Sequence, residues 1–308
     1  MKPKFDIIRL SKWFFLLSSA ITVAGIIVFA TLGFNLGTDF KAGSRVQITF
    51  AKPVDQTKVT QMFNSIGLHV DNTALTVGGV QRNVAIVRFP EIISGAQQDK
   101  LEQQAEVSYF GKKLPTAVQT VDPFVAAQTA RKAVYSVLIA AAFIVVYIAI
   151  RFEFRFAIAG IVALLHDAFI VLAAFALLRR EVDLTFIAAI LTIVGYSIND
   201  TIVIFDRIRE NLKIVKPKDI DTLKQLVNRS LWQTMSRSIN TVITVLIAAI
   251  ILYFFGGVSI RNFTFALIIG LVSGAYSSIF IASPLWVVWR GRSLKGGKGK
   301  SSTKTEPV

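Results

Sequence analysis

The sequence predicts a multi-pass α-helical membrane protein with six transmembrane helices and one extracytoplasmic α+β domain between helices 1 and 2. Charged residues make up 17% of the 308 residues and hydrophobic residues 53%, whereas soluble domains carry about 25% charged residues. Six apolar runs are each about 18 residues or longer, and about 20 apolar helical residues span a bilayer core. Together these observations exclude a soluble, disordered or disulfide-scaffold class.

The first apolar run covers residues 13–33 and follows a short basic segment, residues 1–12. A cleaved signal peptide has a similar start, but this run is too long and no small-residue cleavage site follows it. We therefore predict transmembrane helix 1 here. Helices 2–6 are predicted within residues 133–289, at 133–150, 156–178, 184–205, 238–255 and 263–289. The last run is long enough to be tilted or partly interfacial.

The distribution of basic residues predicts that both chain termini lie in the cytosol. The cytosolic segments would then be residues 1–12, 151–155, the loop 206–237 and the tail 290–308. They hold 20 Lys and Arg against 7 Asp and Glu, while the opposite side holds 14 against 10, as the positive-inside rule requires. Topology and contact with anionic membrane lipid explain the net charge of +15, so nucleic acid is not an expected partner.

Two regions outside the apolar runs have a predicted structure. Residues 34–132 read as strands at 45–50, 75–77, 83–89 and 116–121 and helices at 54–66 and 94–109. Their β-α-β-β-α-β order is the ferredoxin-like arrangement. In the loop 206–237, apolar spacing after Asp219 or Asp221 predicts a short interfacial helix leading into helix 5. The Lys- and Gly-rich tail is expected to be disordered.

Asp200 is the first candidate for chemistry. It lies deep within predicted helix 4, and an ionisable group inside the membrane is costly, which makes it a functional hypothesis by default. A polar stripe that includes Tyr196 and Asn199 adjoins it. The alternative is a structural carboxylate near the membrane boundary, paired with Arg207 or Arg209.

Arg237 is the natural counter-ion of Asp200. It starts a polar stripe with Thr241 on predicted helix 5, which runs antiparallel to helix 4. A buried Asp–Arg pair avoids lone charges in lipid, and a carboxylate reached by water from alternate sides could take and release a proton. The alternative, on geometry alone, is that Arg237 snorkels to the headgroups.

His166 and Asp167 lie in the middle of predicted helix 3. Asp167 is a further candidate for ion coupling, since it could join a proton relay, although it could instead hydrogen-bond a neighbouring helix. For His166 a structural role is favoured over a relay. The chain has no Cys, two His residues and no HExxH pattern, so neither a metal site nor another cofactor is expected. No P-loop and no Gly-x-Ser-x-Gly sequence occurs, so the chain is not expected to be an enzyme, and transport would draw on an ion gradient or a partner motor.

The stretch from Val194 to Asn211, VGYSINDTIVIFDRIREN, closely resembles the signature of the SecF family of protein-export membrane subunits. Residues 151–155, 163–167 and 233–238 are similar to the same family, and the similarity covers roughly residues 10 to 290. The family's Gly-Gly turn after helix 1 has Ala42 at its first Gly position here, and its usual Gly-Pro before helix 2 is Asp122-Pro123.

The resemblance implies a subunit that pairs with SecD as a twelve-span, RND-like unit beside the SecYEG channel. Such a unit would use the proton gradient, or in some relatives a sodium gradient, to help draw preproteins across after the SecA motor. It implies that Asp200 and Arg237 are the ion-coupling pair. The alternative function is an RND-type exporter of lipids or small molecules, but six spans and one small outer domain are only half of such a unit.

Overall fold

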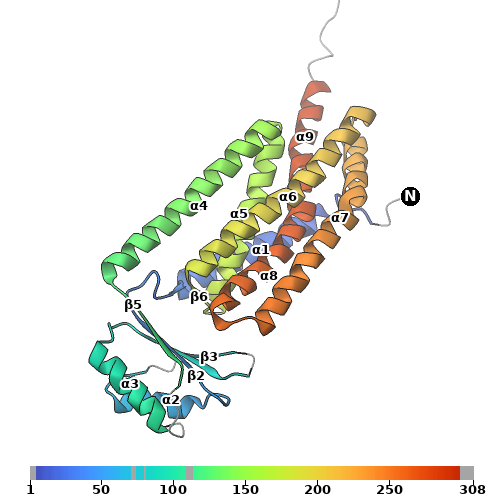
Figure 1. The fold of residues 1–308 in the computed structure, drawn as a ribbon. Helices are drawn as coiled ribbons and strands as arrows, with labels where there is room; N and C mark the ends of the chain where they lie inside the picture. The colour runs from blue at the N-terminus through green and yellow to red at the C-terminus, as the bar shows by residue number, and fades with distance from the viewer. Residues whose placement is uncertain (1–4, 71–73, 80, 109–113, 299–308) are drawn as a thin grey trace, which may run out of the picture.

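The computed structural model describes residues 5–70, 74–79, 81–108 and 114–298. Its long helices form an elongated bundle, and an α+β domain lies at the end opposite to the C-terminal helix (Figure 1). Within these described residues, six helical spans are long and apolar enough to cross a membrane. These are α1 (Ser11–Leu32), α4 (Pro123–Arg151), α5 (Phe154–Leu177), α6 (Leu184–Val215), α7 (Ile220–Phe255) and a composite last span, Val258–Arg292.

The predicted loop 206–237 is wrong in its extent, because helix occupies most of it. Helix α6 continues to Val215, and α7 already begins at Ile220, where Asp219 caps it by accepting from the backbone N–H groups of Asp221 and Thr222. The amphipathic segment predicted as a separate interfacial helix is thus the first part of α7. The apolar pattern ends where charges begin, but the helix itself continues because its buried face stays apolar.

The last span contains a change of helix type. A 3₁₀ turn (Val258–Ile260) precedes α8 (Arg261–Ser277), a π-helical turn follows (Ser278–Ala282), and α9 (Ser283–Lys298) completes it. The Ser283 hydroxyl donates to the Ser278 carbonyl oxygen, 3.1 Å away. Because α9 runs to Lys298, the tail predicted from residue 290 begins as helix, and residues 299–308 lie outside the described residues.

The α+β domain contains each predicted strand and helix. Strands β2 (Gly43–Thr49), β3 (Leu75–Gly78), β4 (Val84–Phe89) and β5 (Thr116–Val121) form an antiparallel sheet in the order β3-β4-β2-β5. Helix α2 (Gln56–Ser65) follows β2, and α3 (Gly95–Ser108) follows β4. Tyr109, the predicted end of the second helix, lies outside the described residues.

The two faces of this sheet have different surroundings. One face packs on α2 and α3 around a core that includes Val46, Phe63 and Leu101. The other face is turned toward the membrane helices (Figure 1) and carries Arg45 and Arg88. The alternation of side chains along β2 and β4 separates these two environments.

A two-stranded parallel ladder, absent from the sequence prediction, ties the exit of α1 to the α5–α6 connection. Strand β1 (Asn35–Leu36) pairs with β6 (Glu181–Val182). The Asp39 carboxylate also accepts from the Leu184 backbone N–H at 3.1 Å, at the start of α6. These contacts hold the entry to the α+β domain against the membrane helices.

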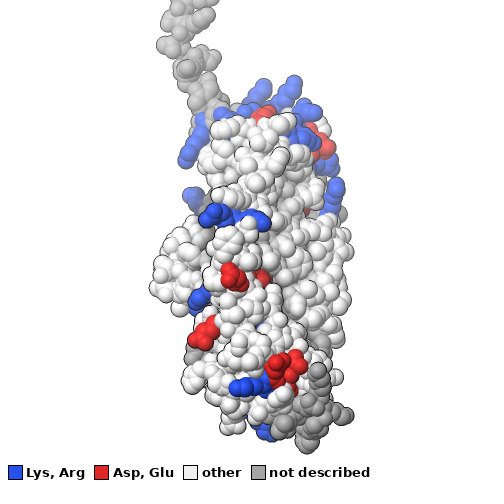
Figure 2. Space-filling view, turned by 60° about the vertical axis from the view of Figure 1, so that its left-hand side comes forward, with Lys and Arg blue, Asp and Glu red and all other residues white. Residues whose placement is uncertain are grey.

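Charge is distributed unevenly along the molecule. In Figure 2, most Lys and Arg side chains of the visible face gather at the end away from the α+β domain, above a largely uncharged band. Acidic side chains appear mainly in the lower half, toward the α+β domain. The uncharged band is what a helix bundle in contact with lipid presents.

Candidate functional site

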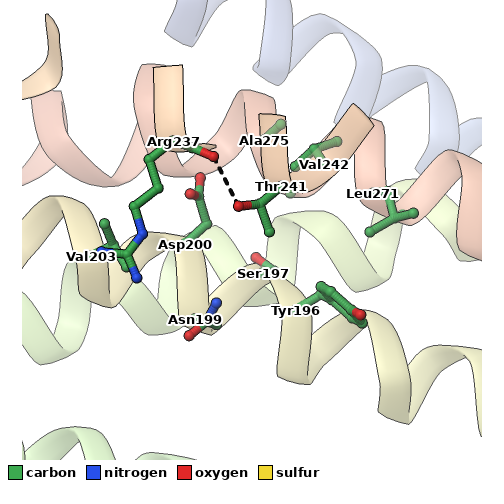
Figure 3. A pocket seen from close by; sticks show the side chains of 12 residues that line it. Tyr196, Ser197, Asn199, Asp200, Val203, Arg237, Thr241, Val242, Leu271 and Ala275 are labelled. Carbon is green, nitrogen blue, oxygen red and sulfur yellow. Dashed lines mark hydrogen bonds between the residues drawn. The ribbon is translucent and has the colours of Figure 1, made fainter. Parts of the chain in front are cut away.

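A polar cavity of about 160 Å³ lies between α6, α7 and α8 within the spanning part of the bundle. Asp200 and Ser197 reach it from α6, and Arg237 and Thr241 from α7 (Figure 3). Gly270 and Gly274 of α8 form its back wall. The structure therefore brings the two residues predicted to couple ions, Asp200 and Arg237, to one cavity.

The Asp200 carboxylate is incompletely paired. Its Oδ2 atom is buried and has no hydrogen-bond partner in the described structure, and the Ser238 hydroxyl is also buried and unpartnered. The polar side chains that lie near this carboxylate are those of Ser238 and Arg237, both on α7. Asp200 and Arg237 line the same cavity (Figure 3) but form no direct ion pair among the described residues. An unpaired buried oxygen is uncommon and calls for an explanation.

The supporting polar residues surround the same cavity, but they do not bond to Asp200. Tyr196 is 38% exposed, and Asn199, Arg237 and Thr241 are also exposed in this single chain. The Thr241 hydroxyl donates to the Arg237 carbonyl oxygen of its own helix at 2.9 Å. The cavity thus has a polar side that this chain leaves open.

The alternative pairing of Asp200 with Arg207 or Arg209 is not formed. Arg207 binds Glu210 at 2.8 Å, and Arg209 lies 3.5 Å from Asp206, one or more turns further along α6. Both arginines therefore belong to a separate charged cluster at the end of the bundle.

Asp167 occupies a different and fully paired environment. It is completely buried and accepts hydrogen bonds from three serine hydroxyls: Ser197 at 2.5 Å, Ser277 at 2.6 Å and Ser273 at 2.7 Å. These donors come from α6 and α8, so one carboxylate on α5 joins three helices. We call this group the Asp167 cluster. Ser197 also lines the Asp200 cavity, and so it connects the two sites.

Close helix packing makes the Asp167 cluster possible. A side chain at Gly270 would collide with Ile193, and a Cβ at Gly274 would lie 3.2 Å from that of Ser197. Small residues let α6 and α8 approach closely. The sequence alone did not point to Ser273 or Ser277 as partners of Asp167. The i, i+4 spacing of Ser273 and Ser277 was the available signal.

His166 lies beside this cluster. Its Nδ1 atom is 3.3 Å from Asp167 Oδ1, and its Nε2 atom is buried without a partner in the described structure. Among the described residues, no group of three or more His, Cys, Asp or Glu side chains is placed to hold a metal ion.

Comparison with known proteins identifies the family. The model of the SecD/SecF protein-export membrane protein C-terminal domain matches residues 100–292, and that of the SecD/SecF GG motif matches residues 27–54. The protein translocase subunit SecF of Alicyclobacillus acidocaldarius is 70% identical over all of this chain and 99% of that protein. The SecDF subunit of Bacillus subtilis is 46% identical over 95% of this chain, which corresponds to 39% of the longer protein.

A solved structure agrees with these sequence matches. The crystal structure of SecDF from Thermus thermophilus, a translocon-associated membrane protein, matches 94% of this chain and 39% of its own with a TM-score of 0.82 and 32% identity. The matches cover both the helix bundle and the α+β domain, and they favour protein export over an exporter of lipids or small molecules. The chain belongs to the SecF family of protein translocase subunits.

Proposed function

We propose that the Asp200 cavity couples the proton-motive force to late preprotein translocation. As a member of the SecF family, the chain is an accessory subunit of the Sec protein-export translocase in the bacterial membrane. The proposal concerns how translocation is coupled to the proton gradient. This coupling needs no catalytic chemistry and no cofactor in this chain, and the SecA motor at the SecYEG channel would still push the preprotein.

The observation that carries the proposal is the unpaired Asp200 carboxylate oxygen beside the unpaired Ser238 hydroxyl. A carboxylate inside the membrane is expensive unless it is paired or protonated. Ser238 and Arg237 lie beside this carboxylate on α7, yet neither the Asp200 Oδ2 atom nor the Ser238 hydroxyl has a hydrogen-bond partner among the described residues. A proton, or a small movement of α7 against α6, would complete the pairing in different ways, and this is what an ion-coupling site requires.

Arg237 is the residue that would respond to the protonation state of Asp200. Its side chain lines the same cavity as Asp200 (Figure 3), and closer approach of the guanidinium to the carboxylate would complete an ion pair. Ionised Asp200 favours that approach, and protonated Asp200 does not. The two protonation states therefore favour two arrangements of α6 and α7.

Asp167 is assigned a positioning role in this coupling. Its three serine hydrogen bonds fix α5, α6 and α8 relative to one another. Because Ser197 binds Asp167 and also lines the Asp200 cavity, the cluster fixes the position of that part of the cavity wall.

SecD is proposed as the partner that covers the open side of the cavity. Tyr196, Asn199 and Arg237 are exposed on the spanning part of α6 and α7, where contact with lipid is unfavourable for polar groups. The SecDF relative of Bacillus subtilis carries both halves in one chain, of which this chain corresponds to 39%.

We also propose that the α+β domain is ferredoxin-like and extracytoplasmic, with both chain termini in the cytosol. Its β-α-β-β-α-β order and the sheet order β3-β4-β2-β5 support the fold. The concentration of Lys and Arg at the opposite end of the bundle supports the orientation (Figure 2).

Gradient-driven preprotein translocation in inverted vesicles tests the coupling. Asp200→Asn preserves size and hydrogen-bonding capacity but removes the titration, so it should abolish gradient-dependent export while membrane insertion and assembly with SecD remain intact. Asp206→Asn is the matched control, since Asp206 lies on the same helix and pairs with Arg151 at 2.9 Å. Normal export by Asp200→Asn would end the coupling proposal.

Arg237 distinguishes coupling from a purely structural pair. Arg237→Ala should impair export, and the neutral double variant Asp200→Asn with Arg237→Ala should recover assembly but not export. Recovery of both assembly and export by the double variant would show that the pair is structural.

A further inference from the structure

A second polar cavity lies between the sheet of the α+β domain and the α5–α6 connection, with a volume of about 370 Å³. Sites for small molecules commonly occupy roughly 300–1,000 Å³. Five arginines and two carboxylates line this cavity. The arginines are Arg45 and Arg88 from the sheet and Arg179, Arg180 and Arg261 from the membrane helices and their connection.

Three of these arginines have donors that the protein does not use. Arg88 binds Glu181 through one terminal nitrogen, while its Nε atom is buried with no acceptor in the described structure. The Nε atom of Arg261 is buried and unpartnered in the same way. Within the described residues, Arg45 forms no hydrogen bond or ion pair. Buried donors without acceptors are costly, so their concentration around one cavity indicates a missing acceptor.

The other two arginines are held by neutral groups. Arg179 donates to the Leu32 carbonyl oxygen at 2.6 Å, and Arg180 donates to the Tyr253 hydroxyl at 2.6 Å. These contacts position the side chains but leave their positive charges uncompensated.

The two carboxylates do not balance the five arginines. Asp183 is engaged as the cap of α6, where it accepts from the Phe186 backbone N–H at 2.8 Å, and it also accepts from Asn262 at 3.0 Å. Glu181 pairs with Arg88 and is itself so buried that desolvation raises the pKa of its carboxyl, although Arg88 and Arg45 oppose this. An excess of three positive charges therefore remains around the cavity.

The sheet register places two of these positive charges next to each other. Arg45 and Arg88 are directly opposite each other on β2 and β4, on the sheet face turned away from α2 and α3. Like charges directly opposite in an antiparallel pair are destabilising. An anion that accepts hydrogen bonds from both guanidinium groups would offset this repulsion and link the two arginines.

We propose that this cavity binds the phosphate group of an anionic ligand and thereby ties the α+β domain to the membrane helices. A phosphate offers several acceptor oxygens and matches the planar fork of arginine. The cavity adjoins the ends of α1, α5 and α6 where these helices leave the apolar band, which is the level of lipid headgroups. A phospholipid headgroup and free phosphate share this chemistry, and the test below separates them.

The test uses the full chain in detergent, with native mass spectrometry to count bound ligand. Phosphatidylglycerol is titrated against wild type, the double variant Arg45→Gln with Arg88→Gln, and Arg261→Gln. We expect one saturable site in wild type and binding at least tenfold weaker in both variants, because each loses charge-assisted hydrogen bonds. Arg131→Gln is the matched control, since Arg131 is exposed on α4 and does not line the cavity.

Two further arms identify the source of the phosphate and test the proposal itself. Inorganic phosphate that displaces the lipid in the millimolar range identifies a soluble phosphate site, whereas binding of phosphatidylglycerol unaffected by phosphate identifies a headgroup site. A glucosyl-diacylglycerol, which lacks phosphate, should not bind there. Equal binding of this glycolipid, no saturable site in wild type, or unchanged binding in both correctly folded variants would each overturn the proposal. Arg261→Gln keeps the test valid if the double variant misfolds, because it leaves the α+β domain unaltered.

Discussion

Removal of the Asp167 carboxylate should destabilise the helix bundle by a measurable amount. In Asp167→Ala, the hydroxyls of Ser197, Ser273 and Ser277 lose their common acceptor in a fully buried position. The three helices α5, α6 and α8 then lose the one side chain to which all of these serines bind. Asp167→Ala is therefore expected mainly to lower the free energy of unfolding.

The magnitude follows from the three bonds. Interhelical hydrogen bonds in membrane proteins contribute about 0.6 kcal/mol on average and at most about 1.7 kcal/mol. Three of them give a loss of roughly 2–5 kcal/mol. Values of about 1.5–3 kcal/mol per bond to a charged group apply to soluble proteins. The membrane values are preferred here, because separated helices in a bilayer also find polar partners.

The assay is equilibrium unfolding of the purified chain in mixed micelles with increasing SDS. Ser197→Ala, Ser273→Ala and Ser277→Ala should each cost about 0.6 kcal/mol and should show little further effect when combined with Asp167→Ala. Ser136→Ala is the control, because the Ser136 hydroxyl is exposed and bonds only to Lys132 of its own helix.

One outcome would refute this reasoning. If Asp167→Ala unfolds like wild type but no longer supports gradient-dependent export, Asp167 is itself an ion-coupling residue and the serines are not structural partners. If it is destabilised and its export per folded molecule falls only in proportion, the positioning role stands.

Three further predictions concern the α+β domain and its contacts. Gly43→Ala should cost roughly 1–3 kcal/mol in thermal or chemical unfolding, because residue 43 has φ +140° and a Cβ there would collide with the Phe89 carbonyl oxygen; an unchanged midpoint would contradict this. Burial raises the pKa of Glu181, so its contribution favours the folded state below the ordinary carboxyl pKa and is lost as the pH rises through the raised value. Glu181→Gln should flatten this part of the pH–stability curve, and a curve identical to wild type would count against the assignment. A Cys at Ser94, in a chain without native Cys, should react with an impermeant thiol reagent in intact cells; labelling only after permeabilisation would reverse the proposed orientation.

Much of the fold is readable from the sequence, since membrane helices and alternating strands have strong local patterns. All six spans overlap the apolar runs that predicted them, although α4 begins at Pro123, inside the predicted domain 34–132. The strands and helices of residues 43–121 also overlap their predicted ranges. The main error lies in the loop 206–237, where hydropathy identified the apolar part of each helix and not its charged continuation. The β1–β6 ladder was missed because two-residue strands carry no periodicity, and its partners are far apart in the chain.

The candidate site was only partly predictable. Asp200 stands out because a carboxylate in an apolar helix is rare, and Arg237 follows from the antiparallel order of the helices. The pairing of Asp167 with serines from α6 and α8 depends on how three helices pack, which a single sequence does not specify. The same holds for Arg45 and Arg88, whose register across two strands places them at the membrane helices.

The π-helical turn at Ser278–Ala282 has a consequence for the phase of the last span. A π turn accommodates one more residue than an α turn, so the helix before it and the helix after it do not share one continuous set of faces. Each residue of an α-helix corresponds to a rotation of about 100°. Upstream, this offset lets Ser273 and Ser277 face Asp167, and downstream it lets Trp286 stack on Phe156 with ring centroids 4.4 Å apart. If the turn relaxed to α geometry, one of these two sets of contacts would be lost, because its side chains would point in another direction. The turn is thus a point at which the two halves of the span can rotate relative to each other while the chain remains helical.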